Sequence, residues 1–563
     1  MAIFEYGEYQ NTYESPDNLV EIFENSVSKY ANNLFIGEKD SSGVYQWVTY
    51  AQIAARVDNL RGGLASLGVQ AGDTVGIIAN NRKEWVIGEM ATQGLRAAFV
   101  PMYEKELVTM WKYIIKDAAV KVLLVSKPEI LEKVKYFPAE IPTLQHIYLI
   151  EGTGDKTMAA LEKKGAEKPV PSQKPKYSDV TVLIYTSGTT GFSKGVMLTA
   201  NNLAGNVTFG IRTELLKKGD KVLSFLPLAH AYGCAFDFLT ATAVGTHVTL
   251  LGKVPSPKII MKAFEEVKPN LIITVPLVIE KIYKNVIQPL ISKKGMKWAL
   301  SIPLLDNQIY GQIRKKLIEA LGGRFKEIII GGAAMNPEVE EFFQRIKFPF
   351  TIGYGMTECG PLISYAPWNE FVRTSSGKIL DIMEARIYKE NPESETGEIQ
   401  VRGENVMAGY YKNPEATAEV FTEDGWLRTG DLGTMDGNGN ITLTGSGGLS
   451  MIVPFEGNGN ITFTGSADLR GRCSMQGEWT PYTELSPENL ARAVWDALAT
   501  QFNETGTMGS KLNTASSGGV DMGAMVDAVL AALNATTIPV DAVQGAWPTA
   551  AENADAVWSK QLP

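Results

Sequence analysis

One stretch constrains this chain more than any other, the segment YTSGTTGFSKGV at Tyr185–Val196. It follows the apolar run Val180–Ile184, which predicts a buried strand. Its glycines let the backbone approach a ligand closely, its hydroxyls add hydrogen-bond donors, and Lys194 adds a mobile positive charge. The combination predicts a nest for a polyanion, most simply a triphosphate. The alternative is a flexible surface loop without a ligand.

The spacing in this segment differs from that of the P-loop of GTPases. A P-loop needs GxxxxGK followed by Ser or Thr, and Gly188 to Lys194 does not fit.

Upstream of this segment the chain alternates strands and helices. We expect strands at Thr74–Ala79, Ala98–Pro101 and Val120–Val125, and a helix at Lys83–Leu95. This alternation predicts an α/β fold with parallel sheets covered by helices on both faces, and ligands beyond the carboxyl ends of the strands. Residues 153–177, rich in Lys, Gly, Glu and Pro, are interpreted as an exposed connector.

Two later segments have the composition of a nucleotide site. Gly331 to Ala334 follow a predicted strand, and small residues let a flat ring lie against backbone; the alternative is a tight turn before a helix that starts at Asn336-Pro337. Gly353 to Glu358 then offers an aromatic face, suited to a purine, and a carboxylate, suited to Mg²⁺.

Taken in order, these segments resemble the adenylate-forming superfamily. PLAHAYG (Pro227–Gly233), GEIQVRG (Gly397–Gly403), GYYKNP (Gly409–Pro414) and RTGDLG (Arg428–Gly433) extend the match. QPLISKKGMKWAL and the long helix after it, to Leu321, resemble the long-chain acyl-CoA synthetase branch. The resemblance implies two doubly wound parallel-sheet subdomains and a small β-barrel subdomain, with residues 1–433 as the adenylating domain.

The resemblance also implies the reaction and the roles of individual residues. A long-chain fatty acid would react with ATP and Mg²⁺ to give acyl-AMP, which coenzyme A then converts to acyl-CoA. The implied catalytic residues are Lys194, His230, Thr357 and Glu358, with His230 beside the acyl carboxylate and Glu358 as the Mg²⁺ ligand. The implied nucleotide-binding residues are Thr186, Ser187, Gly188, Thr189, Thr190, Gly191, Lys194, Gly332, Ala333, Ala334, Tyr354, Gly355, Thr357 and Asp431, with Tyr354 stacking on adenine and Asp431 accepting from the ribose.

Tyr232, Phe236 and Phe238 suit the wall of an acyl pocket, and ordinary core packing is the equal alternative.

Length and composition limit the number of domains, the kinds of partner and the cellular location that we expect. A chain of 563 residues is too long for one core, and its net charge of −9 gives no basic footprint for nucleic acid. The N-terminus predicts no signal peptide, no apolar run predicts a membrane span, and peripheral membrane contact stays open. Three cysteines without metal or disulfide spacing favour a cytoplasmic protein.

The resemblance stops near Thr444. From Thr434 onward five basic residues stand against thirteen acidic ones, and residues 434–563 are interpreted as a divergent region in place of the family's mobile lid. Ser446 stands where the family has an arginine, and the string GNGNIT at Gly437–Thr442 recurs at Gly457–Thr462. The family's C-terminal lysine has no clear counterpart, since Lys511 and Lys560 are weak substitutes.

These departures leave two functions open. The first is a fatty acid–CoA ligase with weak adenylation and weaker thioester formation. The second is a nucleotide- and acyl-binding module, or a pseudoenzyme with an interaction tail.

Overall fold

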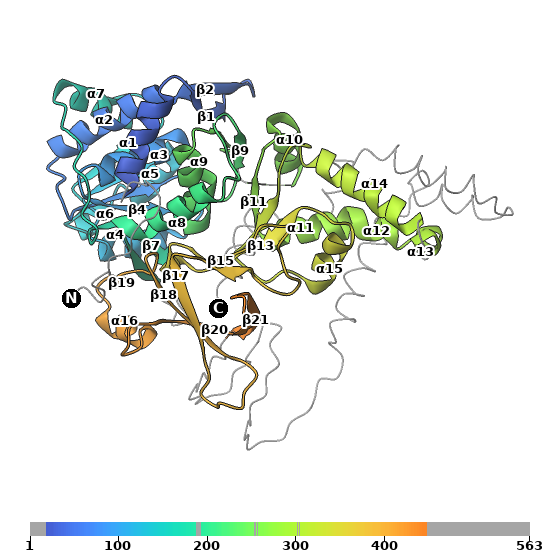
Figure 1. Cartoon of the computed structure of the whole chain (residues 1–563). Coiled ribbons are helices and arrows are strands. Elements are labelled where there is room, and N and C mark those ends of the chain that lie inside the picture. The colour runs from blue at the N-terminus through green and yellow to red at the C-terminus, as the bar shows by residue number, and fades with distance from the viewer. Residues whose placement is uncertain are drawn as a thin grey trace, which may run out of the picture. The chain divides into compact units, whose positions relative to one another are not determined.

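The computed structural model describes residues 18–186, 193–252, 255, 257–300, 302 and 305–446 (Figure 1). Within this part of the chain there are five sheets, three of them mainly parallel and two antiparallel. Two of the mainly parallel sheets are joined by an isolated bridge and are described together below as the second sheet. The α/β fold predicted from the sequence is confirmed.

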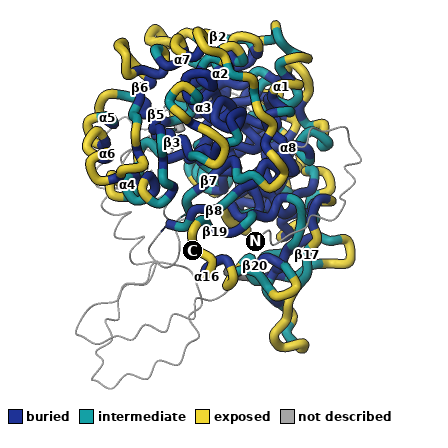
Figure 2. Tube along the Cα trace, turned by 90° about the vertical axis from the view of Figure 1, so that its left-hand side faces the viewer, coloured by how far each residue is buried: buried dark blue, intermediate teal, exposed yellow. Residues whose placement is uncertain are grey.

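The first sheet has seven strands in the order β19-β8-β7-β4-β3-β5-β6. From β7 to β6 all neighbours are parallel, while β8 and β19 add antiparallel pairs. Every residue of β3, β4 and β5 is buried, as expected for strands covered on both faces (Figure 2). The strands are β3 Thr74–Ile78, β4 Ala98–Met102, β5 Val122–Val125, β6 His146–Leu149, β7 Val180–Thr186, β8 Lys194–Thr199 and β19 Gly409–Tyr410.

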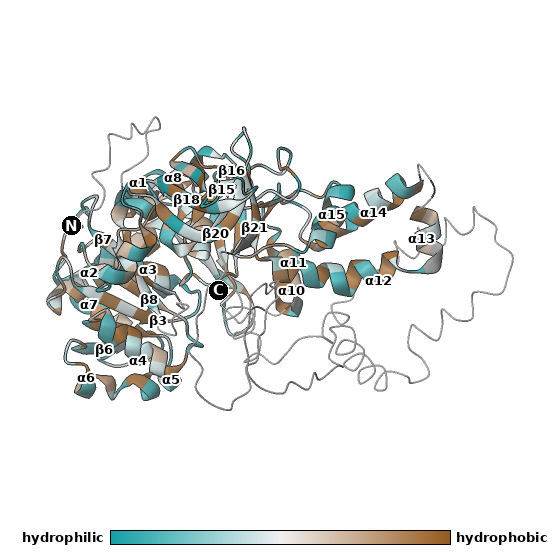
Figure 3. Cartoon of the chain, turned by 90° about the horizontal axis from the view of Figure 1, so that it is seen from below, coloured by the Kyte–Doolittle hydropathy of each residue, from teal (hydrophilic) through white to brown (hydrophobic). Residues whose placement is uncertain are grey.

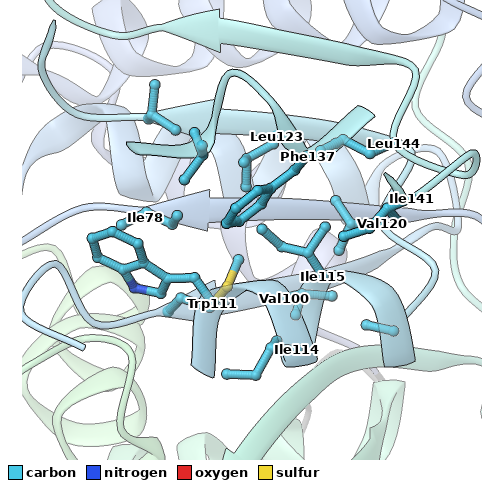
Figure 4. Close-up of a cluster of buried hydrophobic side chains, with 14 of the residues drawn as sticks. Ile78, Val100, Trp111, Ile114, Ile115, Val120, Leu123, Phe137, Ile141 and Leu144 are labelled. Atoms are coloured by element: carbon cyan, nitrogen blue, oxygen red, sulfur yellow. The ribbon is translucent and has the colours of Figure 1, made fainter. Parts of the chain in front are cut away.

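Helices from the first third of the chain cover this sheet. One core cluster joins Trp111 and Ile115 of α4 to Val100 and Leu123 of the strands, with Phe137 closing over them (Figure 4). Burial of such large side chains is the main stabilising term here. The helices are α1 Leu19–Tyr30, α2 Tyr50–Ser66, α3 Lys83–Gln93, α4 Val108–Asp117, α5 Pro128–Val134, α6 Phe137–Glu140 and α7 Met158–Glu167.

The exposed connector expected at residues 153–177 is wrong in part, because it contains helix α7. Met158 and Leu161 of α7 are buried, and Gly165 lies against α2 so closely that a Cβ there would stand 1.8 Å from the carbonyl oxygen of Asn59. Thr157 caps the helix by accepting the N–H of Ala160 at 3.2 Å. Lysines on the outer face of α7 conceal its helical spacing in the sequence.

The second sheet is built in two halves. Strands β2-β1-β10-β9 form one half, and β11-β12-β13 the other, joined by a parallel bridge between Val222 and Leu271. All pairs except β1–β2 are parallel. The strands are β1 Leu34–Lys39, β2 Tyr45–Thr49, β9 Lys221–Ser224, β10 His247–Leu250, β11 Ile272–Thr274, β12 Ile328–Ile330 and β13 Phe350–Ile352.

The helices between these strands come from the middle of the chain. The helix start named in the alternative interpretation of Gly331 to Ala334 is present: Asn336 caps α15, accepting the N–H of Glu338 at 2.9 Å, with Pro337 at the first helical position. The helical segments are α8 Ala200–Arg212, η1 Gly233–Leu239, α9 Thr240–Ala243, α10 Pro257–Val267, α11 Pro276–Ile282, η2 Tyr283–Ile287, α12 Gln288–Ile291, α13 Lys294–Leu300, α14 Leu305–Ala320 and α15 Pro337–Arg345.

The small barrel expected from the resemblance takes the form of two antiparallel sheets, β14-β15-β16 and β17-β18-β20-β21, linked by a bridge between Lys378 and Asn440. GYYKNP is not part of them, because β19 pairs with β8 in the first sheet. Strand β20 runs across the boundary expected after residue 433 and pairs with β21, so this sheet extends to Ser446. The elements are β14 Tyr354–Gly355, η3 Thr357–Cys359, β15 Leu362–Tyr365, β16 Lys378–Ile379, β17 Met383–Tyr388, β18 Gly397–Gly403, α16 Pro414–Val420, β20 Leu427–Met435 and β21 Ile441–Ser446.

Candidate active site

The polyanion segment joins two neighbouring antiparallel strands. Strand β7 ends at Thr186 and β8 begins at Lys194, and these two residues are direct partners in the ladder. Between them, Ser187, Gly188, Thr189, Thr190 and Gly191 lie outside the described residues. Both ends of the turn are fixed, because the Ser193 hydroxyl donates to the Thr186 carbonyl at 2.7 Å and Tyr113 donates to the Ser193 carbonyl at 2.9 Å.

Tyr185 does not serve the nest as one of its hydroxyls. Its hydroxyl donates to the Asp117 carboxylate at 2.6 Å, and burial together with that carboxylate raises the pKa of the phenol. A Cβ on Gly195 would stand 3.0 Å from the Tyr185 ring, a close contact that favours glycine at this position. Tyr185 therefore anchors β7 and β8 to α4.

Three of the remaining motifs follow the carboxyl end of a parallel strand in the second sheet. His230 lies beyond β9, the Gly331–Ala334 segment follows β12, and Tyr354 follows β13. Carboxyl ends of parallel strands meet at one edge, where ligands bind in open α/β sheets. The Tyr232 hydroxyl donates to the Ile329 carbonyl at 3.1 Å and so ties the loop of His230 to β12.

Three side chains meet where the sequence predicts the phosphates to bind, a region called the phosphate end below. The Tyr410 hydroxyl donates to Glu358 Oε1 at 2.8 Å, and Lys194 Nζ lies 4.8 Å from the centre of the Tyr410 ring. Burial raises the pKa of Glu358, while the Tyr410 hydrogen bond and the Lys194 charge oppose the rise. Two of the predicted residues, Lys194 and Glu358, are thus brought together through a third that sequence reasoning missed.

Glu358 is held by a rigid local backbone. Its carbonyl accepts the N–H of Met407 at 2.8 Å, and Asn206 of α8 donates to the Cys359 carbonyl at 3.2 Å. Gly355 permits this arrangement, since a Cβ there would stand 2.2 Å from the Pro361 carbonyl oxygen. Thr357 is buried beside Glu358 in the single turn η3.

The region predicted to bind the nucleoside, called the nucleoside end below, pairs an aromatic ring with a carboxylate. The Tyr354 hydroxyl donates to Asp431 Oδ2 at 2.8 Å, and Asp431 N–H donates to Thr429 Oγ1 at 3.1 Å. Burial raises the pKa of Asp431, and the Tyr354 hydrogen bond opposes the rise. Gly332 has φ +87°, and it is exposed together with Ala333 and Ala334. These exposed small residues fit an adenine-facing role, which stays a prediction.

His230 is a neutral imidazole at neutral pH. Burial lowers its pKa to about 4, and the Tyr232 N–H donates to His230 Nδ1 at 3.2 Å. Because Nδ1 accepts, the proton of the neutral ring sits on Nε2.

Of the three aromatics suggested for an acyl pocket, Phe238 packs in the core. Its ring centre lies 6.4 Å from those of Phe35 and Trp85. Tyr232 and Phe236 contact each other with ring centres 6.1 Å apart and are also buried, so they remain candidates for the pocket wall.

The carboxylate of Glu358 is the kind of ligand that would fit a magnesium ion arriving with the nucleotide. Among the described residues, no group of three or more His, Cys, Asp or Glu side chains could hold a metal ion by itself. Mg²⁺ is usually bound through one or two carboxylates together with substrate phosphates, and Glu358 beside Lys194 provides that pattern.

Comparison with known proteins agrees with this geometry. The family model "AMP-binding enzyme" matches residues 23–411. The FadD15 long-chain-fatty-acid–CoA ligase of Mycobacterium bovis is 31% identical over 435 residues, covering 72% of this chain and 70% of that protein. The peroxisomal long chain acyl-CoA synthetase 7 of Arabidopsis thaliana is 30% identical, covering 73% and 64%. The chain therefore belongs to the AMP-binding enzyme family.

A solved structure supports the fold. The long-chain-fatty-acid–CoA ligase FadD1 of Archaeoglobus fulgidus superposes with a TM-score of 0.64 at 20% identity, covering 78% of this chain and 86% of that one. At this identity the likeness shows the fold alone, an α/β architecture.

Proposed function

We propose that this chain activates long-chain fatty acids with ATP and transfers them to coenzyme A. The observation that carries the proposal is the convergence of Lys194 and Glu358 on Tyr410, beside the linked pair Tyr354 and Asp431. Family membership and the names of the relatives, which are long-chain fatty acid ligases and acyl-CoA synthetases, support the substrate class.

The phosphate end would work mainly by position and charge. Lys194 would neutralise the outer phosphates, Glu358 would hold Mg²⁺, and Thr357 and Thr186 would steady the α-phosphate. The bound ion would draw electron density from the phosphates and orient pyrophosphate as the leaving group. Phosphoryl-type transfers depend largely on such positioning.

The acyl carboxylate needs a donor rather than a base. With its pKa lowered to about 4, His230 stays neutral at pH 7, and its Nε2–H can hydrogen-bond one carboxylate oxygen. The second oxygen is then free to attack the α-phosphate and form acyl-AMP. The thiolate of coenzyme A would next displace AMP.

We expect the adenylation step to be weakened at Ser446. The register of β20 and β21 pairs residue 446 with Asp431, the predicted ribose ligand, and the resembled family has an arginine at this position. Ser446→Arg should therefore raise pyrophosphate exchange several-fold. Unchanged exchange would show that this departure does not limit the reaction.

We also propose contact with an anionic phospholipid bilayer, where long-chain fatty acids accumulate. Residues 281–324 carry nine basic and two acidic residues, a net charge of +7. Because the whole chain has a net charge of −9, the rest of the chain has a net charge of −16. Trp298 within this segment is 43% exposed, and α12 to α14 show hydrophobic and hydrophilic residues side by side (Figure 3). None of the helices in the described residues is long and apolar enough to span a membrane. The basic residues are Lys281, Lys284, Lys293, Lys294, Lys297, Arg314, Lys315, Lys316 and Arg324, and the acidic ones are Asp306 and Glu319.

Vesicle sedimentation tests this contact. The chain should sediment with phosphatidylglycerol vesicles at low salt and much less with phosphatidylcholine vesicles, and Lys284→Glu with Lys293→Glu should reduce binding. Equal binding to both lipids would contradict it. A cytoplasmic location stays a prediction from the cysteine pattern.

Pyrophosphate exchange tests the main function. Palmitate should stimulate exchange of labelled pyrophosphate into ATP. When coenzyme A is added, palmitoyl-CoA should form, at a lower rate than the exchange reaction. Binding of Mg·ATP with neither product would instead identify a nucleotide-binding module.

A further inference from the structure

A single tyrosine connects the two charged groups at the phosphate end. We propose that Tyr410 is a positioning residue, which holds the Glu358 carboxylate for the metal and Lys194 for the phosphates. The inference rests on the proposed function for the identity of the ligand, Mg·ATP. Nothing in the GYYKNP segment indicates this role, since Tyr410 and Glu358 are 52 residues apart.

The Tyr410 backbone is fixed from several directions. Tyr410 pairs with Val196 of β8, its N–H donates to Thr417 Oγ1 at 2.9 Å, and Tyr411 N–H donates to the Gly195 carbonyl at 2.7 Å. Gly409 has φ +134°, and a Cβ there would stand 2.7 Å from Thr417 Cγ2. The strand that carries Lys194 and the strand that carries Tyr410 are therefore locked side by side.

The side chain serves the two charges through different atoms. The hydroxyl donates to Glu358 Oε1, and a hydrogen bond to an ionised carboxylate is stronger than a neutral one. The ring lies 4.8 Å from the ammonium of Lys194, within the range of a cation–π contact. Tyr410 therefore contacts both the cation and the anion.

Because the hydroxyl and the ring make different contacts, Tyr410→Phe and Tyr410→Leu should have different effects on ligand binding. The Phe variant keeps the ring beside Lys194 and loses only the donor to Glu358. The Leu variant loses both contacts. If Tyr410 only filled space, Phe would be neutral and Leu would act through stability alone.

Calorimetry on the full chain, without fatty acid, distinguishes these possibilities. ATP is titrated with MgCl₂ present and again with EDTA present, for wild type, both variants and the neighbouring control Tyr411→Phe. Wild type should bind Mg·ATP more tightly than metal-free ATP. Tyr410→Phe should weaken Mg·ATP binding about tenfold and leave metal-free ATP within about twofold. Tyr410→Leu should weaken both, and Tyr411→Phe neither.

Three results would overturn the inference. Tyr410→Phe could bind Mg·ATP as tightly as wild type does, or it could lose affinity equally for Mg·ATP and metal-free ATP. Wild type could also bind ATP equally well with and without magnesium. Melting curves for all four proteins exclude loss of folding as the cause. Because no acyl substrate is present, failure of palmitate-dependent exchange would count against the proposed reaction and leave this result standing.

Discussion

The two ends of the candidate site are built in different ways. At the phosphate end, two charged side chains and one aromatic side chain from segments far apart in the sequence meet through long-range contacts; they are Lys194, Glu358 and Tyr410. At the nucleoside end, Gly332 to Ala334 offer exposed backbone after a strand, and only the pair Tyr354 and Asp431 adds a long-range contact. The charged side chains of the phosphate end are held in place by contacts with residues distant in the sequence. The adenine ring, by contrast, would need only open space beside the backbone. Substitutions should therefore cost more at the phosphate end.

The largest effect is expected for Glu358→Gln. The amide keeps the shape and an acceptor for Tyr410 but loses the charge that would hold Mg²⁺. Palmitate-dependent pyrophosphate exchange should fall about 10²–10³-fold. Glu341→Gln, which removes an exposed ion pair with Arg373, is the matched control and should change little. A Glu358→Gln rate within twofold of wild type would place the metal elsewhere.

The second prediction concerns the backbone under Glu358. In Gly355→Ala the new Cβ would meet the Pro361 carbonyl 2.2 Å away, so the variant should lose about 2 kcal/mol of stability and also ATP affinity. Gly311→Ala is the control, because it is exposed within α14 and has no atom within 4 Å of a new Cβ. Alanine should stabilise that helix by up to about 1 kcal/mol. Thermal melting measures both, and a Gly355→Ala chain as stable as wild type would contradict the packing.

At the nucleoside end a smaller effect is expected. Asp431→Asn keeps an acceptor for Tyr354 and removes the charge offered to the ribose. The KM for ATP should rise about tenfold, with kcat nearly unchanged. Steady-state exchange kinetics measure the two parameters. A loss as large as that of Glu358→Gln would erase the difference between the two ends.

A buried carboxyl outside both ends should affect stability alone. Glu89 of α3 is fully buried, and burial raises its pKa from 4.5 to about 8. Because the pKa of Glu89 is higher in the folded state than in the unfolded state, protonation of Glu89 stabilises the folded state. This contribution to the free energy of unfolding is fully present below pH 4.5. This contribution is lost as the pH rises through 8.

Glu89→Gln should remove that dependence. Its stability relative to wild type should grow by about 1 kcal/mol per pH unit between pH 5 and 8, with ATP affinity unchanged. Melting temperatures across this range test the sign, and a relative stability that falls with pH would contradict it.

Much of the fold could be predicted because its signals are local. The continuous apolar runs of β3, β4 and β5 specify buried parallel strands, and Asn336-Pro337 specifies a helix start. Helix α7 was missed because lysines mask its buried face. The place of Gly409-Tyr410 beside β8 was missed because two residues carry no periodicity.

The sequence predicts members of the candidate site, whose roles stay predictions, but it does not predict the contacts between them. The motif order indicated Lys194, Tyr354, Glu358 and Asp431, yet no local pattern shows which hydroxyl reaches which carboxylate. Tyr185, expected in the polyanion nest, donates to Asp117, and Tyr410, unassigned, donates to Glu358. Such pairings depend on how strands far apart in the chain are brought together.

The most direct test of the account compares two nucleotides on one variant. We propose that Lys194 contacts the outer phosphates, so Lys194→Ala should weaken Mg·ATP binding at least tenfold and leave AMP binding within twofold. Calorimetry on the full chain measures both affinities. Equal losses for ATP and AMP, or no loss for either, would contradict a polyphosphate site between Lys194 and Glu358.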